Sequence, residues 1–162
     1  MRDPLVFDRN RQDIQVVRQL KKKIDSGQLT PEEQAVWDSG RASLNATQLN
    51  RVEEWTQYLA QQLRNAGYII NVSATETTWS DGDLIYQADI DRIRHNVTAL
   101  RDGYFAIPEW REILDGKKLG MEQSNALEWD LQQCYNWLQA MQSVFMYSGQ
   151  ANTACGLNWY FT

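Results

Sequence analysis

The sequence predicts a mainly α-helical single domain, a bundle of four to five helices with a small β-ribbon near residues 68–80. Three observations predict this fold class. A length of 162 residues is that of one ordinary domain with a substantial core. Five stretches carry helix start signals or apolar residues at helical spacing. The longest apolar runs are three residues, so we expect no helix that spans a membrane.

The first helix is expected to follow Asp8, its predicted N-cap, and to end near Gly27. Residues 1–29 carry a net charge of +3, whereas the rest of the chain carries −8. Cations in the last turns of a helix favour its dipole. We interpret these cations as candidate contacts for an acidic partner, with a solvated helix face as the alternative; they are Lys21, Lys22 and Lys23.

A second, short helix is predicted by Thr30-Pro31-Glu32-Glu33, which combines an N-cap threonine, a proline at the first helical position and a glutamate at the third. Trp37 is its one large apolar anchor. A third helix starts at the cap Asn45. Its apolar stripe is predicted to comprise Leu49, Val52, Thr56, Leu59 and Leu63.

Two more long helices are predicted beyond the third, over about 87–102 and 121–147. Residues 68–72 resemble a short strand, and a polar turn follows over 77–83. Residues 104–120 are expected to be irregular, with one turn of helix at 110–114.

The three longer helices open with a related pattern, at Leu49–Trp55, Ile90–Asn96 and more weakly at Ser124–Asp130. Its polar positions are predicted to fix the register of the packed helices. Arg51 and Arg92 could reach carboxylates on a neighbouring helix, and Glu53 and Glu128 are the candidates. The alternative is that any amphipathic helix start looks somewhat like this. The register residues are Asn50, Arg51, Asp91, Arg92, Asn125 and Glu128.

The sequence offers little for catalysis, and we predict no catalytic residue, no metal site and no cofactor. The chain has one histidine, His95, and two cysteines, Cys134 and Cys155, without metal-ligand spacing. Asp81-Gly82-Asp83 resembles a fragment of a calcium loop but lacks the later glutamate. A net charge of −5 argues against nucleic acid as a partner.

The C-terminal end is unusually aromatic. We predict a helical domain over residues 1–149 and a tail over 150–162 that packs on this chain or on another. Its candidate partner contacts are Trp159, Tyr160 and Phe161.

A set of short motifs, in order, resembles small structural proteins and N-terminal modules encoded among the tail genes of phages and prophages of Firmicutes. The likeness covers about residues 5–149. Its landmarks are Asp8-Arg9 with Asp13, Leu29-Thr30-Pro31-Glu32-Glu33, Leu44-Asn45-Ala46-Thr47-Gln48-Leu49-Asn50-Arg51-Val52-Glu53, Gly67-Tyr68, Trp79-Ser80 with Asp83, Ile90-Asp91-Arg92-Ile93 with Asn96-Val97, Asn125-Ala126-Leu127-Glu128 and Tyr147-Ser148-Gly149. The chain departs from the family at Ile85-Tyr86, where Pro-Thr is usual, and at Leu119-Gly120, where Leu-Thr is usual.

The resemblance implies a non-enzymatic structural or assembly component of a phage tail, near the tail tip, baseplate or fibre. It implies a virion protein that is made in the host cytoplasm. Its partners would be other phage structural proteins and further copies of itself around the tail axis.

Two other function classes remain open on the sequence. One is a receptor- or carbohydrate-binding module that meets a host surface glycan through ring stacking. Its candidate aromatic residues are Trp79, Trp110, Trp129, Trp137 and Trp159. The other is a hydrolase of the host wall that uses Asp83 or His95.

Overall fold

The described part of the chain forms five helices, within the four to five that the sequence predicted. The computed structural model describes residues 2–39, 41, 45–104, 107–113 and 119–156. Within these ranges the helices are α1 (Arg11–Asp25), α2 (Pro31–Asp38), α3 (Ala46–Asn65), α4 (Gln87–Tyr104) and α5 (Met121–Gly156). They form one mainly helical domain.

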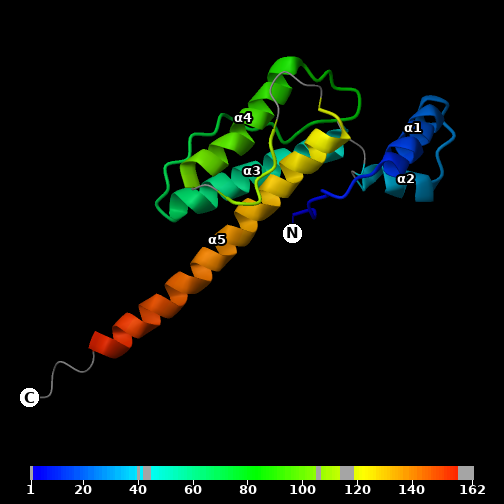
Figure 1. Cartoon of the computed structure of the whole chain (residues 1–162). Coiled ribbons are helices and arrows are strands. Elements are labelled where there is room, and N and C mark those ends of the chain that lie inside the picture. Colours follow the sequence, from blue (N-terminus) through cyan, green and yellow to red (C-terminus); the bar gives the residue numbers. More distant parts are fainter. Residues whose placement is uncertain (1, 40, 42–44, 105–106, 114–118, 157–162) are drawn as a thin grey trace, which may run out of the picture.

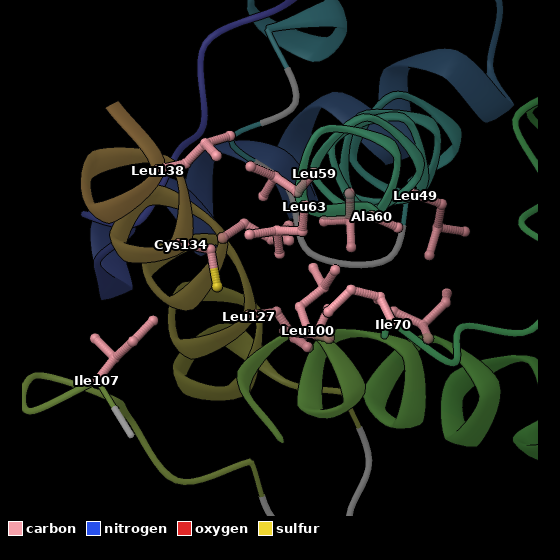
Figure 2. Packing of buried hydrophobic residues seen from close by; sticks show 14 of the residues in the cluster. Leu49, Leu59, Ala60, Leu63, Ile70, Leu100, Ile107, Leu127, Cys134 and Leu138 are labelled. Carbon is pink, nitrogen blue, oxygen red and sulfur yellow. The ribbon is translucent and has the colours of Figure 1, made fainter. Parts of the chain in front are cut away.

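The core lies between α3, α4 and α5, which pack against one another in all three pairings. α1 and α2 form a hairpin at one end of this three-helix unit (Figure 1). The predicted stripe of α3 faces the core, where Leu59 and Leu63 are fully buried against Leu100 of α4 and Leu127 of α5 (Figure 2). Each buried leucine contributes about 1.5–3 kcal/mol of transfer free energy, so this stripe stabilises the three-helix unit.

The helix caps show where local signals suffice and where they mislead. Thr30 and Asn45 cap α2 and α3 as predicted. The prediction for α1 is wrong, because its N-cap is Asn10 and not Asp8. The Asn10 side chain accepts from the N–H groups of Gln12 and Asp13, and the Asp13 carboxylate accepts in return from the Asn10 N–H. This reciprocal capping box satisfies more backbone donors than Asp8 could, and Asp8 pairs with Arg41 at 3.0 Å.

The β-ribbon predicted near residues 68–80 is absent, since these residues form no strand. Side chains of α3 and α4, not a second strand, form hydrogen bonds with backbone groups of this segment. Arg64 donates to the Ile70 carbonyl at 2.7 Å, and Arg92 donates to the Ala74 carbonyl at 3.0 Å. The segment is therefore an extended cover held on α3 and α4.

The last helix is longer than predicted. α5 runs for 36 residues to Gly156, so it includes part of the segment that we expected to be a separate tail. At a rise of 1.5 Å per residue its length is about 54 Å. Its C-terminal part projects beyond the other helices (Figure 1). Trp159, Tyr160 and Phe161 lie outside the described residues. Over the residues that the structure does describe, no helix is both long enough and apolar enough to cross a membrane.

Candidate functional site

A buried polar cluster is centred on Glu128 of α5, whose side chain is fully buried. Arg51 of α3 binds it through two nitrogens, with Nε 2.9 Å from Oε2 and Nη2 3.1 Å from Oε1. Arg9 lies on the other side, with Nη2 2.5 Å from Oε1. The Val6 N–H donates to Oε2 at 2.6 Å. One carboxylate thus joins α3, α5 and the chain segment that precedes α1.

Asn125, one turn before Glu128, holds the same segment by its backbone. Its Oδ1 accepts from the Arg9 N–H at 3.1 Å, and its Nδ2 donates to the Arg9 carbonyl at 2.9 Å. Burial lowers the pKa of the Arg9 guanidinium, against the effect of the neighbouring Glu128 charge. Further out, the Trp55 indole donates to the Asp3 carbonyl at 2.9 Å, so residues 2–9 are fixed along α3 and α5.

The same two-bond clamp occurs on the other two core helices. Asn50 of α3 accepts from the Trp79 N–H at 2.8 Å and donates to its carbonyl at 2.9 Å. Asn96 of α4 does the same to Ser73, at 2.7 and 3.2 Å. Three asparagines therefore each pin one extended segment to one helix.

These clamps relate to the repeated helix opening only in part. Asn50 and Asn125 hold equivalent places in the repeat and make equivalent contacts. Asp91, at the third place, is exposed and accepts from Gln87 on its own helix at 2.8 Å. The clamp of α4 is made by Asn96 instead, a residue that the spacing did not single out.

A second ion pair joins α3 to α4. Arg92 Nη1 lies 2.7 Å from the Glu53 carboxylate, whose side chain is 1% exposed. Burial raises the pKa of Glu53, and the Arg92 charge opposes this rise. Arg51 and Arg92 thus lie against Glu128 and Glu53, the two carboxylates that the sequence offered, and both pairs fix the register of neighbouring helices.

Asp130 is a buried carboxyl with an incomplete set of partners. Its Oδ1 accepts from the Arg111 N–H at 2.8 Å, whereas Oδ2 is buried with no hydrogen-bond partner. Burial raises the pKa of Asp130 to about 8. Residues 110–113 do not form the predicted turn of helix, and Leu114, its last predicted residue, lies outside the described residues.

The residues with nucleophilic or metal-binding chemistry are dispersed. Cys134 is fully buried, and burial together with Asp130 raises the pKa of its thiol to about 12. A thiol with so high a pKa holds its proton at neutral pH and is a poor nucleophile. His95 is exposed on α4. Nowhere in the described ranges do three His, Cys, Asp or Glu residues gather as metal ligands.

A cleft of about 510 Å³ lies between the α1–α2 hairpin and the turn around Asp81. Trp37 and Trp79 line it, together with Lys21. The Trp37 indole donates to Asp81 Oδ2 at 3.0 Å, while the buried indole N–H of Trp79 has no hydrogen-bond partner. Of the five tryptophans proposed for ring stacking, Trp79 lines this cleft, and Trp37 is a neighbour that the sequence did not propose.

The other tryptophan candidates that the structure describes, and Lys22 and Lys23, do not line this cleft. Trp129 packs edge-on to Phe7, with ring centroids 5.3 Å apart, and donates to the Glu109 carbonyl at 2.8 Å. Trp110 and Trp137 are half-buried against the core. All three predicted lysines are exposed at the end of α1, and Lys23 is paired with Glu33.

Comparison with known proteins gave no match to any family model, to any curated protein or to any solved structure.

Proposed function

We propose that this protein is a non-enzymatic structural component of a phage tail, which acts through protein–protein interfaces in the virion. The observation that carries the proposal is helix α5, which continues beyond the bundle to Gly156 (Figure 1). A helix that leaves its own core keeps little tertiary support, and helices of about 12–15 residues are marginal in water on their own. A partner that covers this part of α5 would supply that support.

The buried polar residues support the same proposal. Arg51, Arg92, Glu53 and Glu128 are engaged in ion pairs inside the domain. They hold three helices and two extended segments in one arrangement. Such a network gives a rigid body on which an assembly surface can be presented. The motif resemblance to tail-encoded proteins supports a place near the tail tip, baseplate or fibre.

The proposal is tested on purified phage particles. An antibody raised against the folded protein should label one end of the tail in immunogold electron microscopy, and mass spectrometry should detect the protein at a fixed ratio to the other tail proteins. A protein that is abundant in the infected cell but absent from particles washed at high salt would contradict the proposal.

A second function is favoured by one observation, the cleft that Trp37 and Trp79 line. Indole faces in a concave site are suited to stacking on sugar rings. If the protein is a carbohydrate-binding module of the tail, a glycan array should give a hit that Trp37→Ala and Trp79→Ala both abolish. Trp110→Ala is the control, because Trp110 lies outside the cleft. A hit that survives both cleft variants would contradict this function.

A further inference from the structure

The last fifth of the chain is free of charge. No Asp, Glu, Lys or Arg occurs in residues 131–162, although charged residues make up 23% of the whole sequence. Most of this stretch is helix α5. The described side chains on its outer side are amide, small or apolar, and Asn136, Gln139, Ala140 and Ser143 among them are exposed. A solvated helix face ordinarily carries charged residues, so this surface is unlike that of a free helix.

Two apolar stripes run along α5. The first stripe packs in the core, because Leu131, Cys134 and Leu138 are fully buried. The second starts at the half-buried Trp137 and continues through Ala140 and Val144, of which Val144 is 65% exposed. In the sequence the same alternation of three and four residues goes on through Tyr147, Ala151 and Ala154. This spacing is that of a helix that packs on another helix over several turns.

The absence of charge identifies the partner. In a parallel bundle of identical helices around a rotation axis, each side chain faces its own copy, so any charged position meets a like charge. Because residues 131–156 of α5 carry no charge, this repulsion is avoided along that part of the helix. A partner of opposite charge would instead require charged positions on this part of α5.

We infer that the second stripe of α5, which starts at Trp137, Ala140 and Val144, joins copies of this chain in a parallel helical bundle. The inference rests on the proposed assembly role and names the partner, a second copy of the same chain. The three-helix core of each copy stays outside this bundle, and the projecting parts of α5 meet along the axis.

The first test is the mass of the full chain in solution by light scattering. We expect an oligomer at micromolar concentration. Val144→Glu places a like charge in every copy and should weaken association by at least about tenfold in dissociation constant. Ile69→Glu is the matched control, because Ile69 is an aliphatic residue that is 81% exposed outside α5. A full chain that stays monomeric at 100 times this concentration, or equal effects of the two variants, would overturn the inference.

The second test is the orientation of the helices. Ala140 and Val144 are exposed and lie one turn apart on the second stripe. In a Cys155→Ser background, Ala140→Cys and Val144→Cys should each form a disulfide with its own copy on oxidation, because parallel helices bring both positions of the stripe to the axis. Antiparallel helices allow self-pairing at one level only. A chain in which only one of the two variants cross-links would overturn the parallel arrangement, and Gln61→Cys on α3 is the control for random collision.

The two proposals fail separately. A monomer that is still found in purified tail particles would overturn the self-assembly of α5 and leave the proposed function standing. An oligomer that is never found in particles would overturn the proposed function and leave the self-assembly standing.

Discussion

Glu128 is buried between two cations, Arg9 and Arg51. It stabilises the fold only while all of its partners are present. Moving an ion out of water costs several kcal/mol, and the attraction of its partners offsets this cost only with good geometry. Arg51 supplies that geometry with two parallel bonds to the carboxylate. Arg9 and the Val6 N–H occupy further positions around the two oxygens. The carboxylate therefore acts as the common anchor for segments that are far apart in the sequence.

Replacing Glu128 by Gln should be strongly destabilising. The variant keeps the shape of the side chain but leaves Arg9 and Arg51 buried without a counter-charge, which costs about 3–5 kcal/mol of unfolding free energy. Urea unfolding followed by circular dichroism measures the loss. Glu33→Gln is the matched control, since the same change at the exposed pair with Lys23 should hardly move the midpoint. A Glu128 variant as stable as the control would contradict this account of the anchor.

Asp130 should make stability fall as the pH rises. Its pKa is about 8 in the folded protein against 3.8 for the free side chain, so between these values the folded state holds a proton that the unfolded state has released. The unfolding free energy then decreases by up to about 1.4 kcal/mol per pH unit across this window and levels off above pH 8. Asp130→Asn removes this dependence, because the amide is neutral and its oxygen still accepts from the Arg111 N–H.

The measurement compares urea midpoints of the wild type and Asp130→Asn at pH 5 and pH 8. The stability of Asp130→Asn relative to the wild type should be highest at pH 8, where the buried wild-type carboxyl loses its proton. Glu54→Gln is the control, because Glu54 is exposed on α3. Parallel pH profiles for the wild type and Asp130→Asn would show that Asp130 is ionised in the folded state at neutral pH.

The polar site could be predicted in part from single residues. The arginines and carboxylates of the helix openings occur at positions that helical spacing brings to neighbouring faces, so Arg51 and Arg92 could be matched with Glu128 and Glu53. Arg9 could not, because it lies in extended chain, where helical periodicity says nothing, and its partner Glu128 is 119 residues away. Asn96 was missed for a related reason, since its role depends on where the segment around Ser73 crosses α4.

At the scale of elements, local signals predicted the helices and failed where the tertiary structure decides. Thr30 and Asn45 cap their helices because the donor that each satisfies is three residues away. A strand needs a partner strand, and residues 68–80 find side-chain donors and acceptors on α3 and α4 instead. The end of α5 was predicted at residue 147, whereas the helix runs on to Gly156.

The crossing of the extended segment over α4 depends on Gly103. A Cβ at this position would lie 2.5 Å from Ile70 Cδ1 and 2.7 Å from the Ile69 carbonyl oxygen. Gly103→Ala should therefore cost about 1–3 kcal/mol in unfolding free energy, despite the better helix propensity of alanine. Gly120→Ala is the control, because a Cβ there meets nothing within 4 Å, and its effect should stay below about 1 kcal/mol. Equal effects of the two variants in urea unfolding would show that the segment can move aside.

At the scale of the whole molecule, the protein divides into a part that folds around its own core and a part that leaves it. Leu138 is the last fully buried residue of α5 among those whose side chains the structure describes. Met141 lies about one turn further on. It still packs on the core and accepts from the Tyr68 hydroxyl at 3.3 Å. Val144 is largely exposed. The boundary between the self-contained domain and the projecting helix therefore falls close to Ser143.

Truncation at this boundary separates folding from assembly. A chain that ends at Ser143 keeps every buried residue of α5 that the structure describes, so it should unfold within about 1 kcal/mol of the full chain and with the same cooperativity. It should also lose self-association in light scattering, because most of the second stripe is gone. A chain that ends at Trp137 also loses Leu138 and should be destabilised by about 2–5 kcal/mol, the usual cost of emptying a leucine site. Unfolding of the Ser143 chain would mean that the C-terminal residues belong to the core, in which case they could not be free to join a second copy.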